Sequence, residues 1–456
     1  MSFMYRKLCK EVLLPLGDFL SRQRVMEAYR FYSESQWWDR GRLLDYQNHK
    51  LKETVQIAYH EVPFYRQLYD NMRVKITEIK SVNDLALLPV VTKDMLRPVY
   101  PKGCTRATEW PWQECFTSGS SGQPFAVRLD KLSLSHARAL MLLRANFCGW
   151  DIGMPFLQTG MTLKRGLVKG LKDIALRTHY ASAFDLSDRV LDKYLWLIEK
   201  KKLKYLMGYP GSLYYLALRA AQTGFNLKME GIVSWGDNLY AHYRKAMETQ
   251  FGCKITDTYG CGEGIQVAAQ CRVGGGGYHI FMPHVAVEVV DNEGHPVLAG
   301  ESGNILLTRL DAGAMPLIRY KVGDIGKKHV LDSCSCGRGL EMLAQIEGRD
   351  TDVIITPNGN RLIVHFFTGI FEYFPSIDTF RITQERPESI CVEIVPRPDF
   401  KPEHWDHIKK EILEKGDPDL KIDMVLLRDI PQESCNKRKF VVSRLGAKEQ
   451  ENPALR

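Results

Sequence analysis

The sequence lacks any long hydrophobic run, and this argues against an integral membrane protein. It nowhere approaches the roughly twenty uninterrupted apolar residues that a helix needs to span a bilayer. The first twenty residues contain a short apolar stretch, but charges interrupt it and no small-residue cleavage site follows. We therefore expect no transmembrane segment and no secretory leader, while a peripheral membrane association stays open.

A large excess of charge of one sign is also lacking. The 62 basic residues are offset by 54 acidic ones, which leaves a formal net charge of +8 over 456 residues. This charge suits an anionic small molecule, a glycan or a lipid surface about equally well. The densest basic stretches, residues 164–177 and 199–204, contain no aromatic residues that could stack on bases. We expect no nucleic-acid partner and interpret these stretches as solvated helix faces.

An orderly cysteine framework, an internal repeat and a low-complexity segment are lacking as well. The eleven cysteines are an odd number and are scattered over the whole length. Such a pattern, without a secretory leader, is typical of a reducing compartment. We therefore expect a cytoplasmic protein.

What is present is the composition of an ordinary globular protein that is too long for one simple core. Residues 5–72 carry apolar positions at helical spacing, in a pattern that stops at Pro63, and they predict a helical layer within residues 1–112. Over residues 113–260 short apolar runs, WQECF and FAVRL among them, alternate with longer helical stretches. This alternation predicts parallel strands with crossover helices.

The last third of the chain changes pattern twice. Residues 278–330 are rich in strands separated by turn-forming residues, which predicts a β subdomain within 261–347. Beyond residues 347–352 the segments IDTFRITQE and ESICVEIVP resemble strands and EHWDHIKKEILEK resembles a helix. The predicted fold is therefore α/β. A large N-terminal domain, residues 1–347, would combine layered parallel sheets, helices and the β subdomain, and a small α+β domain would occupy 348–456.

The segment FTSGSSGQPF, residues 116–125, is the strongest local signal of chemistry. Glycines let backbone N–H groups converge, and hydroxyl groups add further donors, so the loop suits phosphate oxygens. It does not have the GxxxxGKS spacing of a P-loop, and a flexible turn is the alternative. The loop residues are Thr117, Ser118, Gly119, Ser120, Ser121 and Gly122.

Three further segments contain candidate binding residues. In DTYGCGEG, Glu263 can hold magnesium and Tyr259 offers a flat face for a purine, unless the segment is a solvent-exposed turn. In MPLIRYKVGDIG, an apolar strand that ends in Gly-Asp, Asp324 can accept two ribose hydroxyl groups, although aspartate in a turn is common. In IEGRDTDVI, Arg349 can neutralise a phosphate at the predicted domain boundary.

Taken in order, these segments resemble the adenylate-forming superfamily of acyl-CoA synthetases, peptide-synthetase adenylation domains and luciferases. The resemblance is closest to the phenylacetate-CoA ligase group, and within it to the adenylation enzymes of capsule biosynthesis. It covers nearly the full length. Segments similar to that group are SQWWDRGRL, AYHEVPFYR, LALLPVVTKDMLR, ASAFDLSD, MGYPGSLYYLA and MPLIRYKVGD.

The resemblance implies a role for each candidate. The loop from Thr117 to Gly122 would cradle the ATP phosphates, Tyr259 would stack on adenine, Gly260 would belong to the nucleotide site, and Glu263 would hold magnesium. Asp324 would bind the ribose, and Arg349 would contact the nucleotide at the hinge of a mobile small domain that rotates between an adenylating and a transfer pose. In IPQESCNKRKFVVSRL, Lys437 would be the adenylation lysine.

The chain departs from the superfamily pattern at three places. Gly236-Asp237 replaces a Ser/Gly-Glu pair, and Asn436 stands where glycine is usual. Thr351 is the residue two after Arg349, so either Asp350 or Asp352 could be the hinge pivot.

Cys271, His279, Cys334 and Cys336 form a second constellation. Three thiolates and one imidazole suit a closed tetrahedral zinc site. Scattered free cysteines are the alternative, because Cys-x-Cys spacing is less diagnostic than two CxxC pairs. The phenylacetate-CoA ligase group often has cysteines and a histidine at these places, which favours structural zinc. The remaining cysteines are interpreted as buried small hydrophobes.

The resemblance implies an enzyme that uses ATP and magnesium to convert a small-molecule or glycan carboxylate into an acyl-adenylate. The acceptor would be an amine or hydroxyl in a surface-polysaccharide pathway, or alternatively coenzyme A (CoA), which gives a thioester. Tyr209 and Trp235 would line the acyl pocket, unless both are core aromatics. A non-catalytic scaffold that binds a nucleotide or glycan is the rival from another class.

Overall fold

The computed structural model describes most of the chain. Its contacts divide the chain into two compact units. The large unit comprises Met1–Leu239, Tyr243–Val322 and Gly326–Ile346, and the small unit comprises Tyr240–His242, Gly323–Ile325 and Glu347–Arg456. The described residues are 2–107, 112–117, 125–160, 166–183, 186, 188–273, 276–330, 333–349, 354–358, 361–362, 367, 370–371, 373–374, 376–430 and 440–445.

Helices fill the start of the large unit, as the periodicity predicts. One helix ends at Glu61, just before Pro63, as predicted, but Pro63 also occupies the first turn of a new helix, where its missing N–H has no helical partner to lose. The Asp39 carboxylate caps the longest of these helices by accepting a hydrogen bond from the Arg42 N–H at 2.9 Å. The helices are α1 (Ser2–Leu8), a π-helical turn (Cys9–Leu13), α2 (Leu14–Ser21), α3 (Val25–Ser35), α4 (Arg40–Glu61), α5 (Pro63–Asn71) and α6 (Lys93–Leu96).

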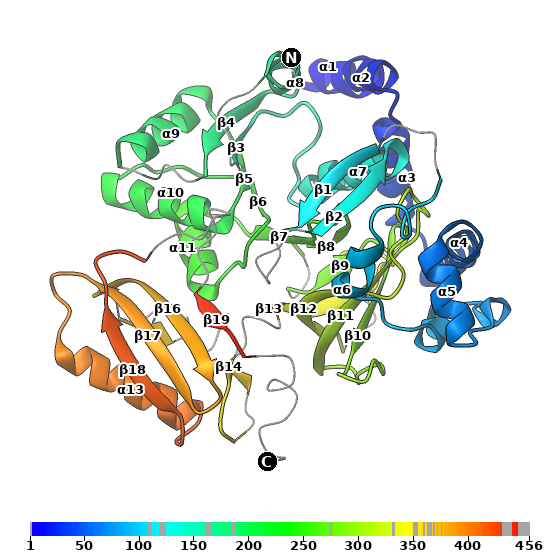
Figure 1. Ribbon diagram of the computed structural model, residues 1–456. Helices are drawn as coiled ribbons and strands as arrows, with labels where there is room; N and C mark the ends of the chain where they lie inside the picture. The colour runs from blue at the N-terminus through cyan, green and yellow to red at the C-terminus, as the bar shows by residue number, and fades with distance from the viewer. Residues whose placement is uncertain are drawn as a thin grey trace. The chain divides into compact units, whose positions relative to one another are not determined.

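An 11-stranded sheet runs through the structure in the order β10-β11-β12-β13-β9-β8-β7-β6-β5-β3-β4 (Figure 1). Neighbouring pairs among β3 to β7 are parallel, whereas β7, β8 and β9 pair antiparallel. The predicted α/β core and β subdomain therefore share one sheet. Its strands are β3 (Phe156–Gly160), β4 (Thr178–Ser182), β5 (Tyr205–Gly208), β6 (Gly231–Ser234), β7 (Ile255–Gly260), β8 (Gln266–Gln270), β9 (Tyr278–Ile280), β10 (Val285–Val290), β11 (Ser302–Arg309), β12 (Tyr320–Lys328) and β13 (Met342–Arg349).

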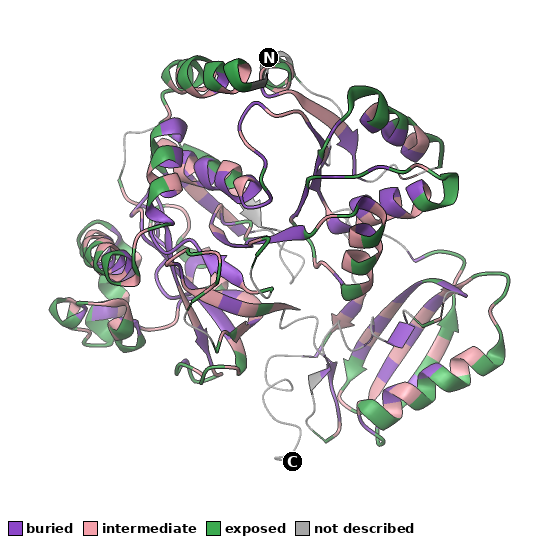
Figure 2. Cartoon of the chain, turned by 180° about the vertical axis from the view of Figure 1, so that it is seen from behind, coloured by how far each residue is buried: buried purple, intermediate pink, exposed green. Residues whose placement is uncertain are grey.

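Crossover helices connect the parallel strands and bury them. All residues of β5 and β6 are buried, which is typical of parallel strands covered on both faces. Figure 2 shows this buried character along the strands and exposed residues on the outer sides of the helices. The helices of this part are α7 (Lys131–Asn146), α8 (Leu167–Ala175), α9 (Asp188–Lys201), α10 (Pro210–Thr223) and α11 (Ala241–Phe251).

The segments WQECF and FAVRL are not part of the parallel sheet, so that part of the prediction is wrong. They form β1 (Trp112–Thr117) and β2 (Phe125–Asp130), an antiparallel pair in a separate two-stranded sheet. Thr117 pairs with Phe125 at the end that carries the connection. Residues 118–124 are too few for a crossover, because parallel neighbours need a connection of about a dozen residues or more.

The small unit has the predicted α+β character. The two segments expected to be strands form β16 (Ile377–Arg386) and β17 (Ser389–Pro396), and the expected helix is α13 (Pro402–Lys415). A four-stranded sheet has the order β18-β17-β16-β19, and α13 buries Ile408 and Ile412. The other strands are β14 (Ile354–Ile355), β15 (Arg361–Leu362), β18 (Lys421–Leu426) and β19 (Val441–Ser443).

Candidate functional site

The turn between β7 and β8 buries an acidic side chain. The Cys261 N–H donates to the Ile265 carbonyl at 3.0 Å, which closes the turn. Gly264 adopts a left-handed conformation (φ +79°), and a side chain there would collide with Leu129 of β2. Gly260 and Gly262 of this turn are exposed, but only 1% of Glu263 is, so its side chain does not point into solvent. The β1–β2 hairpin therefore packs directly against the turn.

Two side chains from other parts of the chain meet Glu263. The Tyr320 hydroxyl donates to Glu263 Oε1 at 2.7 Å, and Lys93 Nζ lies 3.4 Å from the same oxygen. Burial and the neighbouring carboxylate raise the pKa of Tyr320, so its hydroxyl stays a proton donor. Because a carboxylate offers about four acceptor positions on two oxygens, Glu263 can bind a cation in addition to these partners.

Backbone pairing explains how Lys93 and Tyr320 reach this turn. The Val91 N–H donates to the Arg319 carbonyl at 3.0 Å, and the Lys321 N–H donates to the Val91 carbonyl at 2.9 Å. This bridge sets the start of α6 beside the start of β12. Sequence reasoning assigned no role to Lys93 or Tyr320, because neither has a local pattern that indicates a contact so distant along the chain.

Tyr209 and Trp235 follow the neighbouring parallel strands β5 and β6. The Trp235 N–H donates to the Gly208 carbonyl at 3.1 Å, and both side chains are half-buried. Gly236 adopts φ +80°, and a Cβ there would lie 2.8 Å from Cε1 of Tyr209. The two aromatic residues therefore lie together at the carboxyl ends of the strands, the edge where open α/β sheets commonly bind ligands.

Arg144 is a charged residue in this region that sequence reasoning missed. Its guanidinium lies 4.6 Å from the Trp235 ring centroid and donates to Gln266 Oε1 at 3.0 Å. Burial lowers the pKa of Arg144 to about 10. Its position inside α7, among apolar and small residues, gave no local signal of a contact with Trp235 or β8.

The other predicted nucleotide residues are placed only in part. Tyr259 and Gly260 end β7, and the Tyr259 residue is buried. Asp324 lies inside β12, which continues to Lys328, so the prediction that the strand ends at Gly-Asp is wrong. The strand continues through Ile325 to Lys328. Thr117 and Arg349 end β1 and β13, but their side chains, Ser118–Gly122 and Lys437 lie outside the described residues.

The four predicted zinc ligands come together in the large unit. Cys271 follows β8, His279 lies on β9, and Cys334 and Cys336 lie between β12 and β13. Their ligand atoms all lie within 4.8 Å of one another. The Cys271 and Cys334 sulfurs are 3.7 Å apart, and Cys336 Sγ is 3.5 Å from His279 Nε2.

These separations match a tetrahedral metal site. Zinc–sulfur and zinc–nitrogen bonds of about 2.3 and 2.0 Å imply ligand separations of about 3.8 Å between sulfurs and about 3.5 Å between sulfur and nitrogen. A disulfide would need about 2.05 Å between sulfurs, so Cys271 and Cys334 are not joined by one. Burial lowers the pKa of His279 to about 4, which keeps the imidazole neutral and able to act as a ligand.

The remaining cysteines are only partly the buried hydrophobes that were predicted. Cys9, Cys104 and Cys148 are buried. Cys115, Cys253, Cys261 and Cys391 are half-buried, and Cys435 lies outside the described residues.

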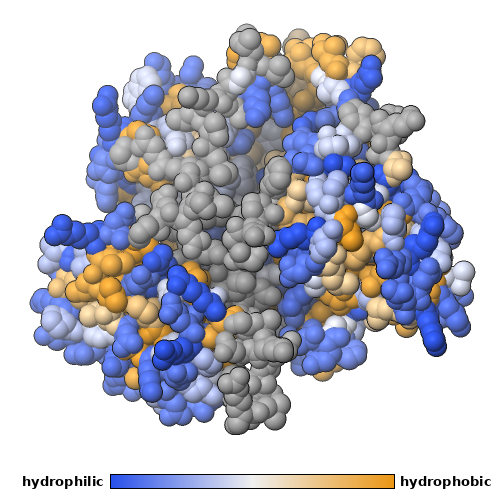
Figure 3. All heavy atoms as spheres, in the orientation of Figure 1, coloured by the Kyte–Doolittle hydropathy of each residue, from blue (hydrophilic) through white to orange (hydrophobic). Residues whose placement is uncertain are grey.

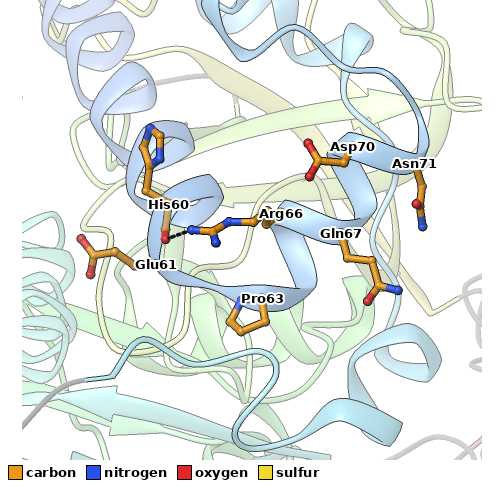
Figure 4. Close-up of a pocket in the computed structure, with 7 residues that line it drawn as sticks. All are labelled: His60, Glu61, Pro63, Arg66, Gln67, Asp70 and Asn71. Carbon is orange, nitrogen blue, oxygen red and sulfur yellow. Dashed lines mark hydrogen bonds between the residues drawn. The ribbon is translucent and has the colours of Figure 1, made fainter.

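A hollow of about 550 Å³ lies on the helical layer, away from these groups (Figure 4). It is lined by the end of α4 and by α5. The Arg66 guanidinium there donates to the backbone carbonyls of Tyr59 and His60, so it caps the end of α4. This contact explains the arginine as a structural group, and none of the predicted site residues lines the hollow.

Comparisons with known proteins agree with the fold. The family model of the CapK C-terminal domain matches residues 354–444. The phenylacetate-coenzyme A ligase of Thermus thermophilus is 28% identical over 332 residues, which cover 69% of this chain and 72% of the relative. The enzyme of the same name from Escherichia coli is 26% identical over 330 residues, with 68% and 71% covered.

Solved structures of low sequence identity share the architecture. One is 2-hydroxyisobutyryl-CoA ligase in the postadenylation state in complex with 2-HIB-AMP, with a TM-score of 0.67, 18% identity, and 87% of this chain and 89% of that chain covered. ATP-bound MatB from Rhodopseudomonas palustris gives a TM-score of 0.51 at 16% identity, with 72% and 65% covered.

The fold and the sequence relatives together define an adenylate-forming ligase, a class of ATP-dependent enzymes that release AMP. Within this class the chain is similar to the phenylacetate-CoA ligases, and residues 354–444 match the family model of the CapK C-terminal domain.

Proposed function

We propose that this ligase activates a carboxylate as an acyl-adenylate and transfers the acyl group to an amine or hydroxyl acceptor in surface-polysaccharide biosynthesis. The observation that supports the first step best is the buried Glu263 in the β7–β8 turn, with Lys93 and Tyr320 against it. The match of the C-terminal domain to CapK supports the second step.

Glu263 is the proposed magnesium ligand. Magnesium, when bound, would neutralise charge on the ATP phosphates and orient them. The Tyr320 hydroxyl fixes the Glu263 carboxylate through a 2.7 Å hydrogen bond, and Lys93 adds a positive charge beside the same oxygen. Both contacts hold the carboxylate in one position before substrates bind, which lowers the reorganisation that binding requires.

The nucleotide would be held by residues from several segments. In our proposal the phosphates lie against the loop from Thr117 to Gly122, which connects two strands of a hairpin whose Leu129 packs on the Glu263 turn. Tyr259 stacks on adenine, Gly260 belongs to the nucleotide site, Asp324 accepts hydrogen bonds from the ribose, and Arg349 contacts the nucleotide at the hinge.

In the adenylation step a carboxylate oxygen attacks the α-phosphorus of ATP. One P–O bond forms, the bond from the α-phosphorus to the bridging oxygen breaks, and pyrophosphate leaves with the electron pair. Lys437 would bridge the carboxylate and the α-phosphate and stabilise the negative charge on the α-phosphate oxygens in the transition state.

Tyr209 and Trp235 are the proposed lining of the acyl pocket. They lie together at the carboxyl ends of β5 and β6, and Arg144 lies over the Trp235 ring. Aromatic side chains suit an aryl acid or a sugar face.

The alternative acceptor is CoA, because the curated relatives are named as CoA ligases. Incubating the protein with ATP, magnesium and a panel of carboxylates, with CoA or with sugar and amino-acid acceptors, and analysing the products by mass spectrometry, separates the two. An amide or ester formed without CoA supports our proposal, and a CoA thioester alone replaces it with the alternative.

We also propose that Cys271, His279, Cys334 and Cys336 bind a structural zinc ion. All four coordination positions would be protein ligands, so the ion would contribute to folding rather than to the reaction. Support comes from the ligand separations given above.

A further inference from the structure

The N-terminal helices expose a row of large apolar side chains to solvent. From Ser2 to Ser21 the chain runs through α1, the π-helical turn and α2. Apolar residues recur at every fourth position and so fall near one face. Figure 3 shows hydrophobic side chains gathered over α1 and α2. The exposed fractions in this row are 78% for Met4, 43% for Leu8, 50% for Val12, 52% for Leu16 and 73% for Leu20.

Helix α8 adds to the same surface. The Tyr5 hydroxyl donates to the Ala175 carbonyl at 2.9 Å, and the Cys9 thiol lies 3.4 Å from that oxygen, so α1 and the end of α8 are in contact. Leu171 and Ile174 of α8 are 68% and 75% exposed. We call Met4, Phe19, Leu20, Leu171 and Ile174 the apolar face; each is at least two-thirds exposed. Apolar patches of this kind on soluble proteins mark interaction sites.

These helices and the residues that flank them hold almost all of the net charge of the chain. Residues 2–24 contain five basic and two acidic residues, and residues 164–177 contain five basic and one acidic residue, which gives +7 against a total of +8. Arg6 and Lys10 face Asp151 at 3.5 and 2.7 Å, while Lys7, Lys169 and Lys172 are exposed. Basic residues therefore border the apolar face.

We propose that α1, α2 and α8 dock this ligase on the surface of an anionic lipid bilayer. The apolar face enters the boundary between headgroups and acyl chains, and the surrounding lysines and arginines contact anionic headgroups, which is how amphipathic basic helices bind membranes in the interface plane. A second copy of the chain does not fit as well, because it would bring an equally positive surface against this one. Docking is independent of the adenylation chemistry proposed above.

Vesicle sedimentation with the full chain tests this inference. One set of vesicles consists of phosphatidylcholine alone, and the other contains phosphatidylcholine mixed with phosphatidylglycerol. We expect the protein to partition into the anionic vesicles about tenfold or more strongly than into the neutral ones. High salt should weaken binding to the anionic vesicles. Phe19→Ser with Leu20→Ser should weaken it about tenfold, and the matched pair Leu298→Ser with Val330→Ser, also exposed, should not.

Two charge-reversal variants test the contribution of the basic residues. Lys169→Glu with Lys172→Glu should abolish the preference for anionic vesicles, whereas Lys52→Glu with Lys245→Glu, on other exposed positions, should preserve it. All variants should keep the melting temperature of the wild type, because the substituted side chains are exposed. Equal binding to both vesicle types overturns the proposal. An absence of vesicle binding also overturns it. If sedimentation velocity then shows a dimer that Phe19→Ser with Leu20→Ser dissociates, the apolar face is instead an interface between two copies of the chain.

Discussion

At the scale of single residues, Glu263 combines a negative charge with almost complete burial. Its oxygen accepts from Tyr320 and lies beside the Lys93 ammonium, so the charge is compensated in the folded protein. We predict that Glu263→Gln abolishes magnesium-dependent adenylation and leaves the fold intact, because an amide oxygen still accepts from Tyr320 but is a poor ligand for magnesium. The measurement is carboxylate-dependent ATP–pyrophosphate exchange, with circular dichroism as the check on folding.

Glu293→Gln is the matched control for this variant. Glu293 is an exposed glutamate of the same unit, in the turn after β10. The ATP–pyrophosphate exchange rate of Glu293→Gln should equal that of the wild type. Unchanged exchange in Glu263→Gln would remove Glu263 from the mechanism.

Lys437 separates the chemistry from nucleotide binding. We predict that Lys437→Ala slows adenylate formation by on the order of a hundredfold or more, with little change in ATP affinity, because its charge acts mainly as the transition state forms. Transfer from a chemically supplied acyl-adenylate should survive, because that step would use the other pose of the small domain. Single-turnover kinetics of each half-reaction measure both effects.

Lys439→Ala is the control for the assignment. In an extended segment Lys437 and Lys439 share a face, so either side chain could enter the site. If Lys439→Ala shows the defect and Lys437→Ala does not, the assignment shifts by two residues. If neither variant shows it, the adenylation role of this segment fails.

At the scale of elements, the proposed zinc site links β8, β9 and the connection between β12 and β13. We predict about one zinc per chain in protein purified without chelator, since four protein ligands make a closed site. Cys334→Ser with Cys336→Ser should release the metal and lower the melting temperature more than it changes ATP affinity, because structural zinc contributes directly to folding. Metal analysis and thermal unfolding measure this.

Cys253→Ser is the matched control, because Cys253 is a half-buried free thiol of the same unit outside the cluster. The Cys253→Ser variant should keep its zinc. Wild-type protein that contains no zinc would contradict the proposed site.

The turn after β6 depends on a glycine. Gly236 has φ +80°, and a Cβ there would press on the Tyr209 ring. We predict that Gly236→Ala destabilises the protein by about 1–2 kcal/mol, the cost of a left-handed residue with a side chain, and raises KM for the acid by displacing Tyr209. Urea unfolding and steady-state kinetics measure these effects.

Gly211→Ala provides the comparison on the neighbouring helix. Gly211 lies in the first turn of α10, where an added Cβ meets no atom within 4 Å. The free energy of unfolding of Gly211→Ala should stay within about 1 kcal/mol of the wild-type value. Equal stability and equal KM in both variants would contradict the role assigned to this turn.

Some elements could be predicted from the sequence because their signals are local. The apolar runs YLMG, GIVS and ITDTYG and the periodic helices between them identify β5, β6, β7 and their crossovers. The β1–β2 hairpin was wrongly predicted because period-two patterns do not distinguish parallel from antiparallel strands; connection length does. The segments FLQTG and THYAS were not singled out as strands, because they are short and mix polar with apolar residues.

Side-chain contacts over long sequence separations could not be predicted in the same way. Lys93, Glu263 and Tyr320 meet because Val91 pairs with the start of β12, and no local pattern encodes that pairing. Arg144 meets Trp235 through the packing of α7 on the sheet. The cysteine and histidine set was predictable, since its residue types are rare and chemically specific.

At the scale of the whole molecule, the chain forms two compact units, as the superfamily resemblance implies. The large unit contains Glu263, Tyr209, Trp235 and the proposed zinc site, whereas Lys437 belongs to the small unit. In our proposal the two half-reactions use different poses of these units. On this proposal Lys437 would be needed for adenylation and dispensable for transfer.

The most direct test of the account is carboxylate-dependent ATP–pyrophosphate exchange by the purified wild-type chain across a broad carboxylate library. We predict magnesium-dependent exchange with at least one acid and recovery of the corresponding acyl-adenylate by mass spectrometry. Protein that binds ATP but gives no exchange with any carboxylate would contradict the account and favour a non-catalytic scaffold that binds a nucleotide.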